Sequence, residues 1–316
     1  MDGDILEIKS AGIVGTGLMG ASLAVLLVGN GIKTVLVGRS DKGCKRGEDI
    51  VNTSFEKMRK AGLITAKQIA AAKRLLTITQ KYTEMKEAQV LFEAVSEHID
   101  TKYEVYKQLD HIVPKAKILA SVTSSIPVEL LAKGALLKNR LLVAHLWNPP
   151  HMVTGVELVK SQYTTEDTME AILTLLKYLG RDVVVLKKDI EGFIGNRIMH
   201  AMYREALYLV EQEIASAEDI DKLIYYSFGQ RFSSVGVLEY FDSCGLDLHI
   251  DVETQIFPTL STEKGPQKII IDNVGKGNLG MKTGKGIFDW SNKDVDEFTY
   301  RKEKPFYQYV NWHFPE

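Results

Sequence analysis

The fold is decided by the stretch Ala11-Gly12-Ile13-Val14-Gly15-Thr16-Gly17-Leu18-Met19-Gly20, in which a short apolar run enters a GxGxxG turn and then a helical pattern. Gly15 permits a tight turn, Gly17 leaves the backbone open to a pyrophosphate, and Gly20 lets the helix pack close to the strand. The N-terminus of that helix offers free N–H groups and a positive dipole end to phosphates. Glycine-rich turns also occur for structural reasons, but this one stands between a strand and a helix and therefore predicts a dinucleotide site. We expect the cofactor to contact Gly15, Thr16, Gly17, Leu18, Met19 and Gly20.

Outward from this stretch, short apolar or β-branched runs alternate with helical patterns over residues 11–188, which is typical of βαβ units and a mostly parallel sheet. The pattern predicts strands at Gly12–Val14, Thr34–Val37, Leu75–Thr79, Val90–Ala94, Ile118–Val122, Leu141–His145, Val156–Val159 and Val183–Leu186. Long helical stretches follow at Ile194–Glu213 and, after the N-cap residue Ser216, at Ala217–Tyr226. We therefore predict an α/β protein: a Rossmann-type, doubly wound, mostly parallel sheet in residues 1–189, and a smaller all-helical domain in residues 190–316.

Composition narrows the class of protein and its partners. The chain has 316 residues, enough for two domains, and 39 Lys and Arg balance 41 Asp and Glu. This balance argues against a protein that coats nucleic acid or an acidic membrane, and indicates small-molecule partners. Cys44 and Cys244 lie too far apart for a CxxC motif or a metal-ligand cluster, so we expect no metal. The apolar stretch Leu18–Val28 is too short to span a bilayer, and Met1-Asp2-Gly3-Asp4 lacks the positive charge of a secretion signal, so we expect a cytoplasmic protein.

The residues after the second predicted strand bear on the choice of cofactor. An NAD site usually carries an acidic residue here, which bonds the ribose 2′-hydroxyl. This chain has Gly38-Arg39-Ser40 instead. Without the acid a 2′-phosphate is not repelled, Arg39 can pair with it and Ser40 can donate to it, so NADP(H) is favoured. NAD(H) stays possible, because Arg39 could instead stack on the adenine.

A histidine and a glutamate provide a candidate for acid–base chemistry. His145 ends one predicted strand and Glu157 lies on the next. A carboxylate that bonds one ring nitrogen leaves the other free to exchange a substrate proton, as a dehydrogenase requires. A hydrogen-bonded structural histidine and a solvated glutamate would give the same pattern.

With these residues in view, the sequence resembles the 3-hydroxyacyl-CoA dehydrogenase family, which includes 3-hydroxybutyryl-CoA dehydrogenases and CoA-independent relatives. The resemblance runs over nearly the whole chain. Besides the glycine loop it rests on Glu93-Ala94-Val95-Ser96-Glu97, Ser121-Val122-Thr123-Ser124-Ser125, His145–Pro149, Glu157, Gly192-Phe193-Ile194-Gly195-Asn196-Arg197 and Gly245-Leu246-Asp247.

The resemblance implies catalytic roles for four residues. His145 would be the general base in alcohol oxidation and the acid in ketone reduction, with Glu157 orienting it. Ser124 and Asn196 would bond the substrate oxygens and fix the reacting carbon against the nicotinamide. Without the resemblance, Ser124 and Asn196 would be interpreted as helix caps rather than as functional residues.

Further positions follow from the same resemblance. Glu97 and Lys102 would line the nicotinamide-ribose side of the cofactor, and Asn148 would lie close to the catalytic base. Ser54 matches a serine that contacts CoA, whereas the matching lysine position is Ala61, beside Lys60. Ser54 and Lys60, with Ser124 and Asn196, are thus the candidate substrate-binding residues.

The expected activity is the interconversion of a short-chain 3-hydroxyacyl-CoA and its 3-keto form by hydride transfer with NAD(P), as in fatty acid metabolism. Two alternatives stay open: a dehydrogenase of a CoA-free 3-hydroxy acid or alcohol (a sugar acid, a carnitine-like or an aromatic compound), and a non-catalytic dinucleotide-binding protein. Leu146-Trp147 and Val235-Gly236-Val237-Leu238 depart from the motifs of acyl-CoA members. The resemblance also implies a homodimer.

Overall fold

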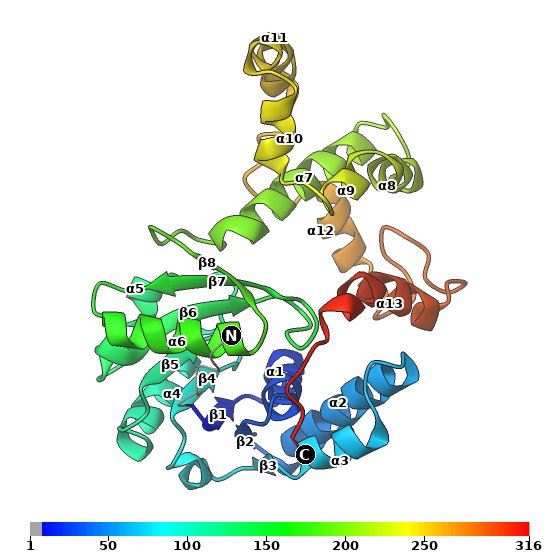
Figure 1. The fold of residues 1–316 in the computed structure, drawn as a ribbon. Helices are drawn as coiled ribbons and strands as arrows, with labels where there is room; N and C mark the ends of the chain where they lie inside the picture. The colour runs from blue at the N-terminus through cyan, green and yellow to red at the C-terminus, as the bar shows by residue number, and fades with distance from the viewer. Residues whose placement is uncertain (1–7, 316) are drawn as a thin grey trace. The chain divides into compact units, whose positions relative to one another are not determined.

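Eight strands form one sheet in the order β3-β2-β1-β4-β5-β6-β7-β8, in a computed structural model that describes residues 8–315 (Figure 1). Neighbouring strands are parallel except for the antiparallel pair β6–β7. Their bounds are β1 Ser10–Val14, β2 Lys33–Val37, β3 Leu76–Thr79, β4 Val90–Glu93, β5 Ile118–Ser121, β6 Leu141–Leu146, β7 Gly155–Lys160 and β8 Asp182–Val185. The eight predicted strands and the mostly parallel sheet are confirmed; Met1-Asp2-Gly3-Asp4 lie outside the described residues.

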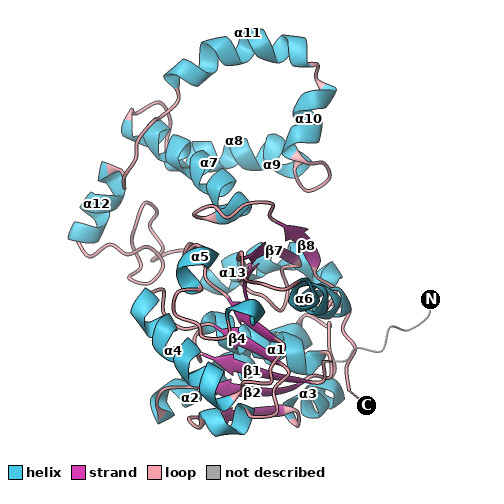
Figure 2. Cartoon of the chain, turned by 90° about the vertical axis from the view of Figure 1, so that its left-hand side faces the viewer, coloured by secondary structure: helices cyan, strands magenta, loops and turns pink. Residues whose placement is uncertain are grey.

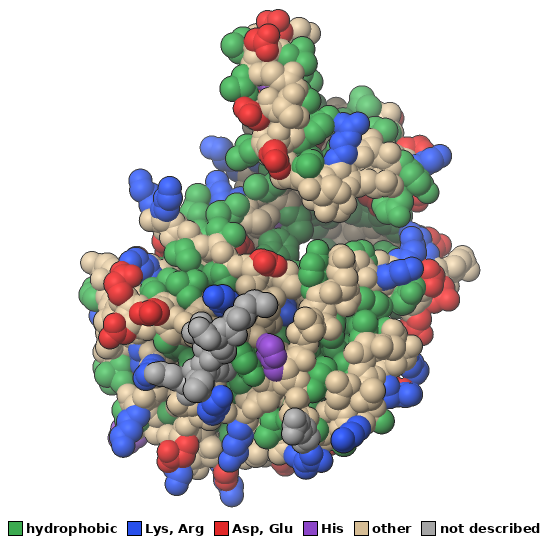
Figure 3. Space-filling view, in the orientation of Figure 1, with side chains coloured by type: hydrophobic (Ala, Val, Ile, Leu, Met, Phe, Trp, Pro, Cys, Tyr) green, Lys and Arg blue, Asp and Glu red, His purple; other side chains and the backbone are tan. Residues whose placement is uncertain are grey.

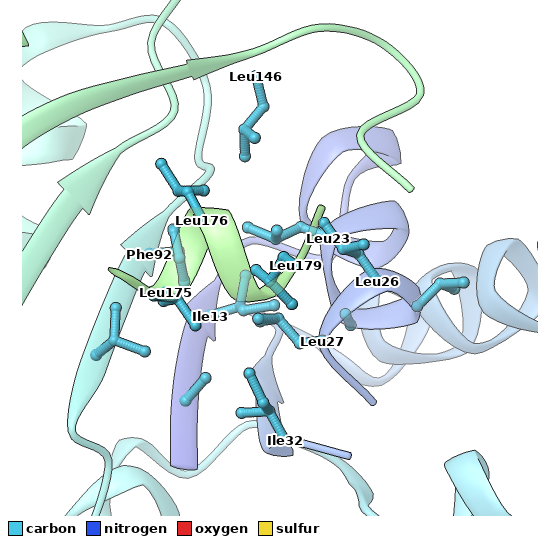
Figure 4. Packing of buried hydrophobic residues seen from close by; sticks show 14 of the residues in the cluster. Ile13, Leu23, Leu26, Leu27, Ile32, Phe92, Leu146, Leu175, Leu176 and Leu179 are labelled. Atoms are coloured by element: carbon cyan, nitrogen blue, oxygen red, sulfur yellow. The ribbon is translucent and has the colours of Figure 1, made fainter. Parts of the chain in front are cut away.

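Helices cover both faces of the sheet, because successive side chains of each strand point to opposite sides. Phe92 of β4 packs with α1 and α6, whereas its neighbour Leu91 packs in a second core that includes α4. Figure 4 shows leucines of α1 and α6 meeting over Ile13 of β1. The helices of this part are α1 Leu18–Gly29, α2 Asp41–Lys60, α3 Ala66–Lys73, α4 Ile99–Ile112, α5 Val128–Leu131 and α6 Glu166–Tyr178, with the 3-10 turns η1 Tyr82–Met85 and η2 Lys138–Arg140.

The chain divides into two compact units. Of the described residues, 8–194 and 301–315 form the first unit and 195–300 form the second. Figure 2 shows the second as helices and loops, and among its described residues only isolated bridges such as Gly280–Lys285 occur. Its helices are α7 Phe193–Glu211, which begins in the first unit, α8 Ala217–Tyr226, α9 Phe228–Arg231, α10 Val237–Ser243, α11 Leu246–Ile256, η3 Phe257–Thr259 and α12 Lys268–Gly275. The predicted α8 is confirmed, and Ser216 caps it by accepting from the Asp219 N–H at 3.1 Å.

The end of the chain packs on the sheet-containing unit. α13 Val295–Glu303 and η4 Lys304–Tyr309 lead into a segment in which Trp312 is buried against Gly29 at the end of α1. The backbone N–H of His313 donates to Asn30 Oδ1 at 3.0 Å, and the His313 ring stacks on Tyr178 with 4.7 Å between centroids. The division at residues 189 and 190 stays a prediction about domains; the compact units differ from it in placing residues 301–315 with the first.

Many apolar side chains of the helical unit are exposed. None of the residues of α8, α10 or α11 is buried, and their exposed apolar side chains include Leu238 and Ile250. Figure 3 shows apolar side chains at the surface of this unit. No helix within residues 8–315 is long and apolar enough to cross a membrane.

Candidate active site

The glycine loop lies where the strand order changes direction, between β1 and β4. Gly15 has φ +119°, and a Cβ at this position would lie 2.3 Å from the carbonyl oxygen of Ala94. A Cβ on Gly20 would lie 1.9 Å from the Gly15 carbonyl oxygen, whereas one on Gly17 would meet no atom within 4 Å. Gly15 and Gly20 are therefore required by the protein's own packing. Gly17 borders open space at the first turn of α1, where a pyrophosphate fits.

His145 and Glu157 form a buried pair across two strands. They are directly opposite in the antiparallel register of β6 and β7, where facing side chains are close neighbours. His145 Nδ1 lies 2.7 Å from Glu157 Oε2, and their side chains are only 5% and 8% exposed. Since Nδ1 is engaged by the carboxylate, Nε2 is the ring nitrogen left to exchange a proton with a substrate.

Two aromatic rings and one backbone amide surround this pair. The His145 ring centroid lies 5.6 Å from that of Trp147 and 5.2 Å from that of Phe193. The backbone N–H of Ile194 donates to Glu157 Oε1 at 2.7 Å. The imidazole and the carboxylate thus each have contacts beyond the bond that joins them.

A buried ion pair stands at the carboxyl end of β4. Glu93 and Lys102 are 0% and 1% exposed, and Lys102 Nζ donates to Glu93 Oε1 at 2.9 Å. Glu93 Oε2 accepts from Tyr106 at 2.9 Å and from Ser121 at 2.7 Å. Burial and the neighbouring Glu93 carboxylate raise the pKa of the Tyr106 hydroxyl well above its usual value, so the phenol stays a donor. The buried charges are therefore paired and hydrogen-bonded, as their desolvation requires.

Lys102 also links this pair to the loop after β5. Its ammonium lies 3.2 Å from Glu97 Oε2, while Glu97 Oε1 accepts from the Thr123 hydroxyl and, at 2.9 Å, from the Ser124 N–H. Partial burial raises the pKa of Glu97, but the Thr123 hydrogen bond, the charge of Lys102 and the Ser124 N–H together outweigh it and lower that pKa. Glu97 is thus an ionised anchor for the backbone that carries Ser124. Lys102 is itself too buried to present its side chain to solvent.

Hydrogen bonds from a buried arginine hold the loop after His145 in place. It contains a cis peptide bond between Asn148 and Pro149, and Arg181 donates to the carbonyl oxygens of Pro150 at 3.2 Å and Val153 at 3.0 Å. His151 in the same loop is buried, and burial, Arg181 and Lys57 lower its pKa to about 3. Burial likewise lowers the pKa of Arg181 to about 10.

The remaining candidate cofactor- and substrate-binding residues differ in how far they are exposed to solvent. Arg39 and Ser40 are exposed after β2, and Ser40 Oγ accepts from the Gly43 N–H at 3.1 Å. Ser54 is only 8% exposed, whereas Lys60 is exposed at the end of α2. Asn148 is exposed beside His145 along the chain.

The reading of Ser124 and Asn196 as helix caps is wrong for both. α5 begins after Pro127, so Ser124 lies ahead of its cap, and α7 begins at Phe193, so Asn196 lies inside the helix. Asn196 belongs to the second unit, and its role toward a substrate stays a prediction.

Two residues of the site were not selected from the sequence. Glu93 is an acidic residue in the apolar run Val90–Ala94, a signal that could have identified it. Phe193 lies in the stretch Gly192–Arg197 on which the resemblance rests, but the sequence assigned it no role, because its backbone conformation and its contact with His145 appear only in the folded chain.

Comparisons with known proteins identify the family of the chain. The protein-family model described as "3-hydroxyacyl-CoA dehydrogenase, NAD binding domain" matches residues 10–190. A second family model, "3-hydroxyacyl-CoA dehydrogenase, C-terminal domain", matches residues 192–290. The 3-hydroxybutyryl-CoA dehydrogenase of Mycobacterium tuberculosis is 30% identical over 290 residues, covering 90% of this chain and 99% of that protein. The 5-formyl-3-hydroxy-2-methylpyridine 4-carboxylate 5-dehydrogenase of Mesorhizobium japonicum is 27% identical over 282 residues, covering 89% and 90%.

A solved structure of an enzyme with the latter activity, described as an NAD⁺-dependent dismutase, has the same fold. It superposes with a TM-score of 0.85 at 24% identity, covering 95% of this chain and 97% of the other. The family models and the named relatives show an oxidoreductase with an NAD-binding domain that acts on a CH–OH group. The chain belongs to the 3-hydroxyacyl-CoA dehydrogenase family.

Proposed function

We propose that the protein interconverts a short-chain 3-hydroxyacyl-CoA and its 3-keto form by hydride transfer with NAD(P), and that His145 exchanges the hydroxyl proton. The observation that carries the proposal is the 2.7 Å bond between His145 Nδ1 and Glu157 Oε2, both buried at the edge of the sheet where the glycine loop lies. General acid–base catalysis of this kind contributes ~10²- to 10⁴-fold in rate.

The chain's own residues fit a dinucleotide. Gly17 and the N–H groups at the start of α1 would hold the pyrophosphate, and Glu97 would accept from the nicotinamide ribose. When bound, the dinucleotide supplies the hydride acceptor for oxidation or the hydride donor for reduction.

His145 exchanges the proton with the substrate, and Glu157 holds His145 in place. In oxidation His145 Nε2 accepts the proton of the substrate hydroxyl, and in reduction it donates a proton to the carbonyl oxygen. The Glu157 carboxylate holds Nδ1 and stabilises the imidazolium that forms. Ser124 and Asn196 are proposed to bond the substrate oxygens and so to orient the reacting carbon.

A CoA-free 3-hydroxy acid or alcohol is the second candidate substrate. Two observations favour it. Ser54, a candidate CoA contact, is buried. The relative from Mesorhizobium japonicum is named as a dehydrogenase of a pyridine carboxylate, and its name does not mention CoA. Trp147, half-buried with its ring 5.6 Å from His145, would suit a smaller substrate.

A substrate panel separates the two candidates. Purified protein is expected to reduce acetoacetyl-CoA with NADPH. If acetoacetyl-CoA is inert and a free 3-keto acid turns over, the CoA-free candidate replaces the first. If neither a CoA-linked nor a free 3-keto compound turns over with either cofactor, the proposed function is wrong.

We propose NADP(H) as the preferred cofactor. Arg39 and Ser40 are both exposed, and Ser40 caps α2 as an acceptor, so its hydroxyl hydrogen can still be donated to a 2′-phosphate. The Michaelis constant for NADPH is expected below that for NADH, and Arg39→Ala should remove most of the difference. A lower Michaelis constant for NADH in the unaltered protein would refute this preference.

A homodimer is proposed through the helical unit. α10, α11 and η3 line an apolar groove with Leu238, Phe241, Leu246, Ile250 and Phe257, and burying such a surface against a second copy would remove it from water. Sedimentation at micromolar concentration should give twice the mass of the chain; a monomer alone would contradict the proposal.

A further inference from the structure

Phe193 has a backbone conformation that phenylalanine rarely adopts. Its φ is +52°, in the left-handed region, and it follows Gly192 with φ +76°. Left-handed conformations are routine for glycine, but in a bulky residue they are outliers that the surrounding structure must hold in place. The Phe193 side chain is nevertheless 0% exposed. A glycine would make this turn without strain, so the ring itself needs an explanation.

The ring lies against the imidazole of His145. Their centroids are 5.2 Å apart with an interplanar angle of 42°. Trp147 also contacts that imidazole, but it is only half-buried, so Phe193 is the more enclosed of the two neighbours. Rotation of the imidazole would break the 2.7 Å bond from Nδ1 to Glu157. A buried ring packed beside it opposes that rotation.

The same turn also reaches the carboxylate. The N–H of Ile194 donates to Glu157 Oε1 at 2.7 Å, while Glu157 Oε2 bonds His145. One strained turn, Gly192-Phe193-Ile194, therefore contacts both members of the pair, the imidazole through a side chain and the carboxylate through a backbone amide. Left-handed conformations of non-glycine residues cluster at sites where precise placement is needed.

We infer that Phe193 is a positioning residue, which holds His145 in the orientation that proton exchange requires. This inference rests on the proposed function of His145. Phe193 acts through His145, so its loss should lower the rate of the chemical step and leave cofactor binding intact.

Phe193→Leu tests this, with Phe55→Leu as the matched control, because Phe55 is a 1% exposed phenylalanine of the same unit that belongs to the other core cluster. Phe193→Leu is expected to lower kcat by roughly 10- to 100-fold, since small misplacements of reacting groups have effects of that order. The substrate KM and the cofactor Kd should change by less than about threefold, and Phe55→Leu should leave kcat nearly unchanged. Phe193→Met gives the same readout if the leucine variant does not fold.

The decisive step repeats Phe193→Leu in the His145→Gln background. If Phe193 acts through His145, the second substitution causes no further loss of kcat there. An equal loss in both backgrounds, or a loss no larger than that of Phe55→Leu, would overturn the inference. Wild-type turnover by His145→Gln alone would overturn the proposed function itself, and the inference with it.

Discussion

Gly17 and Gly20, in the turn after β1, have different roles. A Cβ on Gly20 would overlap the Gly15 carbonyl oxygen at 1.9 Å, so Gly20→Ala must displace the backbone. A Cβ on Gly17 would meet no protein atom within 4 Å, so Gly17→Ala should fold normally. It would instead occupy space that we assign to the pyrophosphate.

The two substitutions should therefore separate stability from cofactor affinity. Gly17→Ala is expected to weaken NADPH binding about tenfold or more with little change in the thermal midpoint, while Gly20→Ala lowers both. Isothermal titration and thermal unfolding measure the two quantities. Unchanged affinity in Gly17→Ala would contradict the assignment of this space.

Another single residue, His151, should make stability depend on pH. Its pKa is about 3 in the folded chain, lowered by burial and by Arg181 and Lys57 from an ordinary 6.5. Well above pH 6.5 the imidazole is neutral in both states and contributes no pH dependence. As the pH falls from 6.5 toward 3, only the unfolded chain gains the proton, so the folded state loses about 1.4 kcal/mol per pH unit from this group.

Replacing His151 with glutamine removes this titration. Urea unfolding at pH 6.5 and pH 5 should show that His151→Gln loses about 1.6 kcal/mol less stability over this interval than the unaltered protein. The same loss in both proteins would mean that His151 titrates normally in the folded chain.

At the scale of elements, the parts that depend on local pattern were predictable. The eight strands follow from apolar runs between turn signals, and α8 from Ser216 and the helical pattern after it. The pairing of His145 with Glu157 could be anticipated as a contact between successive strands, but the register that places them opposite required the sheet. The turn at Phe193 and the return of residues 301–315 to the first unit depend on contacts distant in sequence, which no local pattern encodes.

The return of the chain's end gives a test at this scale. Gly29 and Gly275 each end a helix, but a Cβ on Gly29 would lie 2.3 Å from the Trp312 ring, while one on Gly275 would meet nothing within 4 Å. Gly29→Ala should destabilise the protein by roughly 1–3 kcal/mol and expose the last residues to protease, because Trp312 must move. Gly275→Ala should be neutral or slightly stabilising. Equal effects of both substitutions would show that Trp312 does not pack on α1 as described.

For the molecule as a whole, the central claim is that one edge of the sheet brings a dinucleotide loop and a proton-exchanging histidine together. The glycine turn follows β1, the anchor Glu97 follows β4, and His145 lies near the end of β6. The carboxyl ends of parallel strands meet at one edge, where open α/β sheets bind their ligands. The fold thus supplies the site, whereas the choice of substrate depends on the side chains that surround it.

The most direct test of that claim is the turnover number of His145→Gln, measured with the 3-keto substrate that the unaltered protein reduces and with saturating cofactor. Our account predicts a fall in kcat of ~10²- to 10⁴-fold, with the cofactor Kd essentially unchanged. A variant that binds the cofactor and retains wild-type kcat would contradict it.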